Sequence, residues 1–295
     1  MTALLHCLVG DVAAALDSTA LSGQPLPHRD SEEIVARLSR SGLLDIPDLI
    51  ALLLQRADQD RIGTAARARS GRGEPRMVQG LVSFEDAEIA AAAMGLVIAR
   101  GRRRDRFGNC LALLDDVSPD AAIALVHAVA AALRSTGADS ASAQDPALSS
   151  AAADVISRHD EARGENALAQ SLAARLAHLP DWEEQLLVAA ADGEPAILGF
   201  MLAERARVPG QCGVDALLSG DVADTTRLFR LAGVGRETFG RFVASVGDLF
   251  GVTDAAAAMH DFDSLEEGDI SRHRAWLSAS PQYRTAAERL GAGRG

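Results

Sequence analysis

The sequence predicts an all-α protein, built as a helical-repeat, α-solenoid-like stack of short antiparallel helices. Hydrophobic residues make up 48% of the 295-residue chain but aromatic residues only 4%, so we expect a core of Ala, Leu, Val and Ile packed helix against helix. Ala and Leu are the strongest helix formers, whereas the β-branched and aromatic residues that favour strands are scarce. Apolar residues recur at helical spacing in short segments that Gly, Pro or Asp interrupt, and no segment shows a convincing strand pattern.

The first clear helix is expected to begin at Asp30, because this N-cap residue is followed three places later by Glu33, as in a capping box. It is expected to stop at Gly42. The next helix opens at Asp45, carries Pro47 in its first turn and has a wide apolar stripe.

A strong helix is predicted over 84–100, because acidic residues in its first turn and basic residues from Arg100 onward suit the two ends of the helix dipole. Ser118 is a good N-cap residue, and Pro119 suits the first helical position. These two residues predict the start of a helix over 121–134.

The segment 135–146 is small, polar and aperiodic, which is typical of a linker. It predicts an N-terminal helical domain, 1–136, that contains the Arg-rich segment, and a C-terminal helical domain, 147–295. Helices of the C-terminal domain are predicted over 148–158, 165–179, 181–191, 195–207, 214–218, 222–232, 237–250, 254–259, 269–278 and 281–290. Such lengths, joined by short turns, are typical of α-solenoids, although the sequence has no strict period.

Charge and composition limit the classes of partner and compartment. The formal net charge of −12 argues against a general affinity for nucleic acid or anionic membranes. The three Cys residues lack disulfide or zinc spacing, no apolar run reaches membrane-spanning length, and the N-terminus lacks the basic start of a secretory signal. We therefore expect a cytoplasmic protein with no membrane association, no metal and no cofactor.

A basic run with one aromatic neighbour holds the most concentrated chemistry in the chain. The expected binding residues are Arg100, Arg102, Arg103, Arg104, Arg106 and Phe107. Guanidinium groups pair with carboxylates and phosphates, so an acidic protein partner is expected, with a phosphate or nucleic acid as an alternative. Phe107 alone offers little base stacking, which argues against single-stranded nucleic acid. The run also suits a solvated helix end, where basic charges favour the dipole.

A metal-dependent phosphohydrolase of the all-helical HD type is a second hypothesis. Such enzymes bind a divalent ion through His and Asp side chains and activate its water. The candidate ligands are His127, the pair His159 and Asp160, and the pair His260 and Asp261 with Asp263. Neither pair is followed by the Gly-Lys typical of that family. His127 on its own suits a core or boundary position.

Several segments together resemble a known family. They are 56–62 (RADQDRI), 88–108, 185–193 (QLLVAAADG) and 228–239. Over about residues 45–250 the chain resembles an alphaproteobacterial family of helical-repeat, HEAT-like proteins of unknown function. This resemblance implies an all-α cytoplasmic protein and carries over no catalytic residues.

The function predicted from the sequence is that of a non-enzymatic protein–protein interaction scaffold or regulator. The basic run from Arg100 to Arg106 is its expected electrostatic contact, because its guanidiniums are the densest charged group in the chain.

Overall fold

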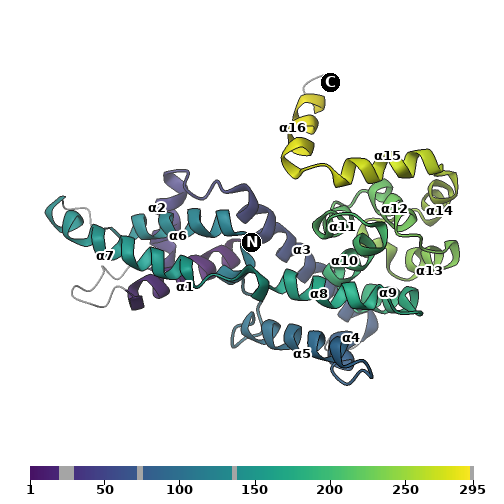
Figure 1. Ribbon diagram of the computed structural model, residues 1–295, viewed down its shortest axis with the longest axis horizontal. Helices are drawn as coiled ribbons and strands as arrows, with labels where there is room; N and C mark the ends of the chain where they lie inside the picture. The colour runs from purple at the N-terminus through teal and green to yellow at the C-terminus, as the bar shows by residue number, and fades with distance from the viewer. Residues whose placement is uncertain (20–29, 72–75, 135–137, 293–295) are drawn as a thin grey trace. The chain divides into compact units, whose positions relative to one another are not determined.

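The computed structural model describes residues 1–19, 30–71, 76–134 and 138–292. Over these ranges the chain folds into α-helices and short 3-10 helices, with no strand (Figure 1). Within the same ranges, the β-type pairing consists of one isolated antiparallel bridge between Arg104 and Cys110. The predicted all-α fold class is therefore confirmed. No single described helix combines the length and the apolar character needed to cross a membrane.

Most successive helices of the described residues are joined by short connecting segments. The α-helices are α1 (Thr2–Thr19), α2 (Ser31–Arg40), α3 (Pro47–Ser70), α4 (Met77–Leu81), α5 (Ala87–Arg102), α6 (Pro119–Leu133), α7 (Ala138–Ser157), α8 (Glu165–Leu176), α9 (Trp182–Ala191), α10 (Pro195–Ala206), α11 (Gly210–Leu218), α12 (Val222–Leu231), α13 (Arg236–Val246), α14 (Ala255–Ser264), α15 (Glu267–Ser278) and α16 (Pro281–Ala292). The 3-10 helices are η1 (Leu114–Asp116), η2 (Glu161–Arg163) and η3 (Gly247–Phe250).

Local sequence signals explain many of the helix ends. The Asp221 carboxylate accepts a hydrogen bond from the backbone N–H of Ala223 at the start of α12, and Asp254 accepts one from Ala257 at the start of α14. Asp30 precedes α2 as predicted, but its side chain makes no capping hydrogen bond. Gly42, predicted to stop the first clear helix, has positive φ, as do Gly193, Gly220, Gly233 and Gly251 after later helices.

Helix α1 is an element that the sequence analysis missed, because it placed the first helix at Asp30. Leu4, Leu8, Val12 and Leu16 are buried on one face of α1. These residues recur at every fourth position, which is the helical period that could have revealed the helix.

The predicted linker, 135–146, falls partly outside the described residues, which exclude 135–137. Its remainder forms the first half of α7, with Pro146 inside the helix. Leu148, Ala151 and Val155 of α7 are buried in the core beside α1 and α6. Packing of the second half of α7 thus stabilises a helix whose first half has the composition of a linker.

The chain divides into two compact units, each made of two separate stretches of sequence. Unit 1 contains Met1–Ala57 and Leu96–Leu168, and unit 2 contains Asp58–Gly95 and Ala169–Gly295. This division differs from the predicted domains 1–136 and 147–295. A change in composition along the sequence can reveal a domain boundary that the chain crosses only once. It cannot reveal these units, because each is formed by contacts between two stretches that lie far apart in the sequence.

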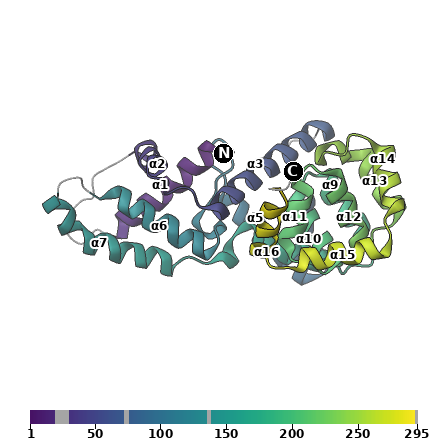
Figure 2. The same ribbon diagram turned by 90° about the horizontal axis from the view of Figure 1, so that it is seen from above.

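Unit 1 is a small helical bundle around a core of Leu, Val, Ile and Ala. Helix α1 packs against α2, α6 and α7, and α6 packs against α2 and α7. Figure 2 shows α1, α6 and α7 running beside one another. Leu8, Leu125 and Val126 are fully buried in this core, which matches the predicted aliphatic packing.

Unit 2 combines packing between consecutive helices with contacts between more distant ones. Helices α9, α10, α11 and α12 pack each against the next, as in a repeat array, but α13 also packs against α9 and α14 against α12. The solenoid-like arrangement stays a prediction, because contacts limited to neighbouring repeats are its defining property.

Unit 2 differs from the predicted aliphatic core because it gathers five of the eight Phe residues of the chain. The Phe229 ring lies 4.5 Å from the Phe242 ring, measured between centroids, and the Phe239 ring lies 4.6 Å from that of Phe262. Phe250 extends the group through Phe242. These spacings suit favourable aromatic pairs, so a few large side chains fill a core that the low aromatic content did not suggest.

Helices α10 and α11 make the closest helix contact of this unit through glycine. A Cβ built on Gly213 would lie 2.2 Å from the carbonyl oxygen of Gly199, and one on Gly199 would lie 2.8 Å from the backbone of Val214. Only the absence of a side chain at these two positions permits the backbones to approach so closely.

We expect Gly213→Ala to destabilise unit 2 by about 1–3 kcal/mol, since an added methyl group must push α10 and α11 apart. Urea unfolding followed by circular dichroism measures this change. Gly95→Ala is the matched control, because Gly95 lies inside α5 with no atom within 4 Å of the new Cβ. Its unfolding free energy should rise by about 0.5–1 kcal/mol. Equal effects of both substitutions would contradict the close-packing account.

Candidate functional site

The predicted binding run separates into two groups at the end of α5. Arg100 and Arg103 turn inward within unit 1, whereas Arg102, Arg104, Arg106 and Phe107 are exposed. Arg100 lies in the last turn of α5 and Arg103 directly after the helix, and both side chains pair with acids of unit 1. The sequence analysis predicted that all six residues form one binding surface.

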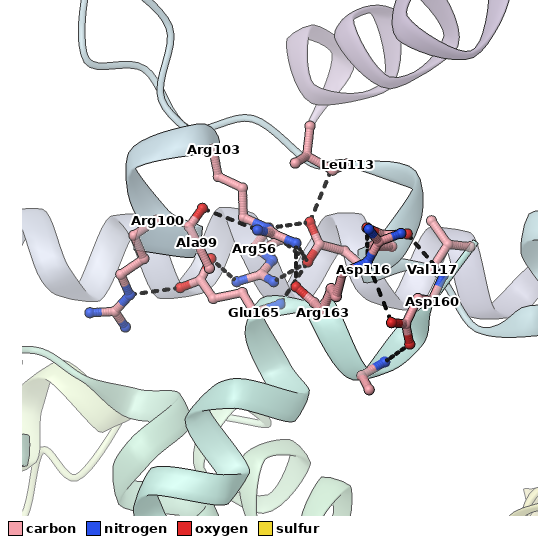
Figure 3. Close-up of polar contacts among 12 residues, drawn as sticks. Arg56, Ala99, Arg100, Arg103, Leu113, Asp116, Val117, Asp160, Arg163 and Glu165 are labelled. Carbon is pink, nitrogen blue, oxygen red and sulfur yellow. Dashed lines mark hydrogen bonds and ion pairs between the residues drawn. The ribbon is translucent and has the colours of Figure 1, made fainter. Parts of the chain in front are cut away.

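The inward group belongs to a cluster of charged side chains, which we call the ionic cluster. Its members are Arg56, Arg100, Arg103, Asp116 and Glu165. They come from α3, the end of α5, η1 and the start of α8, and Figure 3 shows them converging on Asp116 and Glu165.

Asp116 is the centre of the ionic cluster. Its carboxylate is completely buried and lies 2.9 Å from the guanidinium of Arg103 and 3.3 Å from that of Arg56. The backbone N–H groups of Leu113 and Glu165 also donate to it, each at 2.9 Å. Four donors therefore surround a carboxylate that has no access to water, which is the condition that makes a buried charge tolerable.

Glu165 joins the same cluster from the first position of α8. One of its carboxylate oxygens lies 2.7 Å from Nη1 of Arg56, and the other accepts from Nε of Arg100 at 2.9 Å. Arg56 thus bridges the two acids. A carboxylate at a helix N-terminus also interacts favourably with the helix dipole.

The cluster's arginines are further held by backbone carbonyl groups. Arg103 donates to the carbonyl oxygens of Ala99 and Arg163, each at 3.1 Å (Figure 3). With one side chain contacting α5, η1 and the end of η2, Arg103 locks three segments of unit 1 together. Its guanidinium has the planar fork that suits several simultaneous acceptors.

Burial alone raises the pKa of the Asp116 carboxyl, but the charge of Arg56 and the hydrogen bond and charge of Arg103 outweigh it. The pKa of Asp116 therefore lies below its ordinary value. Glu165 behaves in the same way: burial raises its pKa, but the charges of Arg56 and Arg100 lower it by more, so its pKa lies below the ordinary value. Both acids are charged at neutral pH.

A second layer of contacts joins η1 to η2. The backbone N–H of Asp160 donates to the Asp115 carboxylate at 3.0 Å, and Nε of Arg163 lies 3.3 Å from the same group. Gly164 approaches so closely that a Cβ there would lie 2.6 Å from the carbonyl oxygen of Asp115. These contacts order the loop from which Glu165 enters the ionic cluster.

The exposed group lies on what we call the Arg–Phe turn, residues 102–110. The backbone N–H of Leu111 donates to the carbonyl of Arg103 at 2.8 Å, and that of Asp105 donates to the carbonyl of Asn109 at 3.0 Å. The bridge between Arg104 and Cys110 completes a tight reversal of the chain. The turn therefore starts where Arg103 is anchored.

Asp105 fixes the backbone of this turn from within. Its carboxylate accepts hydrogen bonds from the backbone N–H groups of Phe107 and Asn109 and from the Asn109 side chain, each at 2.8 Å. The Asn109 side chain, followed by these backbone groups, lowers the pKa of Asp105. Gly108 supplies the positive φ, 83°, that the reversal requires.

Phe107 lies at the tip of the turn and is 74% exposed. The Arg106 guanidinium carbon lies 4.7 Å from the centre of its ring, a cation–π arrangement. Arg102 and Arg104, in the same turn, are also exposed. The turn can thus present one aromatic ring and three guanidinium groups to a partner.

The residues of the metal hypothesis are dispersed. Nε2 of His159 lies 3.0 Å from the Val117 carbonyl oxygen, and the Asp160 carboxylate accepts from the backbone N–H of Ala162. His127 is exposed, where a core or boundary position was expected. Asp263 pairs with Arg236. Over the described ranges, no three His, Cys, Asp or Glu side chains are grouped as metal ligands would be.

We expect Asp116→Asn to cost about 3–5 kcal/mol of stability, because it leaves buried guanidinium groups without their counter-charge. Denaturant unfolding monitored by circular dichroism measures the loss. Asp145→Asn is the matched control in the same unit, since its pair with Arg134 is about half exposed, and its effect should be small. A small effect of Asp116→Asn would show that the cluster does not stabilise unit 1.

We also expect stability to fall in acid through the cluster. Because the pKa values of Asp116 and Glu165 are lowered in the folded state, their contribution is complete above the ordinary carboxyl pKa of about 4 and is lost as the pH falls below it. Urea midpoints between pH 7 and pH 3 test this. The fall should be shallower in Asp116→Asn, and an unchanged slope would contradict the assignment.

The comparisons with known proteins place this chain among bacterial proteins. Residues 35–273 match the model of a family described as an uncharacterised protein conserved in bacteria (DUF2336). The match includes the ionic cluster and the Arg–Phe turn but neither α1 nor α16. No curated protein and no solved structure matches the chain. The resemblance to a family of unknown function is confirmed, while its alphaproteobacterial and helical-repeat features stay predictions. The chain belongs to the DUF2336 family.

Proposed function

We propose that this is a non-enzymatic protein that binds an acidic protein partner through the Arg–Phe turn, as a scaffold or regulator. The observation that carries the proposal is Phe107, a large aromatic side chain that is 74% exposed at the tip of an ordered turn. Exposed aromatic and Arg side chains are the residue types that dominate binding energy at protein interfaces.

The order of the turn supports a binding role. The three hydrogen bonds to the Asp105 carboxylate hold the backbone around Phe107 in one conformation. A loop that is already rigid before binding loses less conformational entropy when a partner contacts it. The inner end of the turn is anchored by Arg103, whose guanidinium is paired with buried Asp116.

The charge of the turn indicates the chemistry of the partner. Arg102, Arg104 and Arg106 are exposed, and the opposing carboxylate, that of Asp105, is occupied by hydrogen bonds from its own turn. A surface of guanidinium groups favours carboxylates. A single aromatic ring and a net charge of −12 favour an acidic protein over nucleic acid.

The proposal includes the finer predictions about fold and location. Consecutive packing of α9, α10, α11 and α12 supports a repeat-like array, and such arrays commonly serve as binding scaffolds. We place the protein in the cytoplasm of an alphaproteobacterium, on the resemblance described above.

Site-specific photo-crosslinking tests the proposal. A photoreactive phenylalanine analogue replaces Phe107 in the full chain, expressed in the native host, and adducts are identified by mass spectrometry. We expect a discrete protein adduct whose yield falls when Arg102 and Arg104 are replaced by Ala, because the guanidinium contacts are lost. With the purified partner, Phe107→Ala should weaken binding by about 2 kcal/mol, about 30-fold.

The matched control places the same analogue at Tyr283, which is 62% exposed on α16. This position should not give the same adduct, and Phe107→Ala should leave the melting temperature unchanged because the ring packs little against its own chain. The proposal fails if Phe107 yields no protein adduct, or if both positions capture the same proteins equally.

A further inference from the structure

The first half of α3 leaves two apolar side chains uncovered in unit 1, Ile50 and Leu54, and Leu43 is exposed in the turn before the helix. We call these three residues the α3 apolar face. Leu43 is 47% exposed, Ile50 38% and Leu54 49%. The adjacent side of the helix holds buried Leu49 and Leu53 and directs Arg56 into the ionic cluster. The buried side of α3 makes the contacts that hold the helix in unit 1. The packing of unit 1 therefore does not cover the α3 apolar face.

The charged residues in the stretch of sequence that carries this face are acidic. Between Leu43 and Gln55 the charged residues are Asp45 and Asp48, both exposed, and this stretch contains no Arg. The Asp48 carboxylate accepts a hydrogen bond from the Ser118 hydroxyl at 2.9 Å, which fixes its position at the start of α3. The face therefore offers an apolar strip with acids at one end.

The Arg–Phe turn has the complementary composition, with one large ring among three exposed guanidinium groups. In the folded chain Phe107 remains 74% exposed, so the turn does not bury its ring on its own α3 apolar face. We infer that the acidic partner of the turn is a second copy of this chain, whose α3 apolar face receives Phe107 while Asp45 and Asp48 meet the guanidinium groups. This inference rests on the proposed function.

Such a contact joins two different surfaces, so it is heterologous. Each copy offers one turn and one face, and association head to tail either closes a ring or continues as an open chain. Every copy that exposes the turn also carries the complementary face at the same concentration. The mass of the assembly should therefore rise with protein concentration.

Analytical ultracentrifugation of the full chain at physiological ionic strength, between about 1 and 100 μM, tests the inference at concentrations where contacts of this kind form. We expect the unaltered chain to sediment as dimers or larger species at the upper concentrations. Phe107→Ala removes the ring, and Leu54→Arg places a repelling charge on the face, so each variant alone should be monomeric. An equimolar mixture of the two should form a heterodimer and nothing larger, because it contains one intact turn and one intact face.

Val188→Arg is the matched control, because Val188 is 43% exposed on α9 in the other unit. It should assemble as the unaltered chain does. Circular dichroism and melting of every variant show that it is folded, and Leu54→Asn serves as a second variant of the face if Leu54→Arg melts early. A monomeric unaltered chain, assembly of the single variants, or a mixture that stays monomeric each overturns the inference.

The photo-crosslinking experiment separates this inference from the proposed function. If the unaltered chain is monomeric but the analogue at Phe107 still captures a different acidic protein, the second copy is wrong and the proposed function stands. If the analogue captures no protein, the proposed function falls and the inference falls with it.

Discussion

The structure of unit 1 depends on keeping the Asp116 carboxylate charged in the absence of water. Removing such a group from water costs several kcal/mol, which only close opposite charges and hydrogen bonds offset. Arg56, Arg103 and two backbone N–H groups provide them. Because these donors come from α3, the residue after α5, the residue before η1 and the start of α8, the carboxylate can be satisfied only when all four segments are in place. The cluster therefore specifies how they meet, in addition to any stability that it adds.

The candidate binding surface is a consequence of the same constraint. Arg103 is held by Asp116 and by two backbone carbonyl groups, and it anchors the inner end of the Arg–Phe turn. Asp105 then organises the turn with hydrogen bonds to its own backbone. Buried Asp116 and half-buried Asp105 thus hold the two ends of one short segment, which keeps the backbone around Phe107 in a fixed conformation for contact with a partner.

The helices of unit 2 are held together in a different way, by the fit between small and large side chains. Gly199 and Gly213 bring the backbones of α10 and α11 into contact, and five Phe rings fill the space among α12, α13, η3 and α14. Small and large side chains are both needed, because closely packed helices leave gaps that alanine cannot fill. A scarce aromatic content therefore does not imply a core without aromatics.

The sequence by itself determined the all-α class and most helix ends, because Asp221, Asp254, Gly193 and Gly220 act on residues within one turn of themselves. It also located the Arg-rich run. It could not divide that run, since the inward turn of Arg103 depends on Asp116, 13 positions away, and that of Arg100 depends on Glu165, 65 positions away. The two units, each assembled from separate stretches, were decided only by tertiary contacts. The steric and hydrogen-bond preferences that set helix ends act between residues that are close in the sequence. Burial and ion pairing depend instead on which distant segments meet.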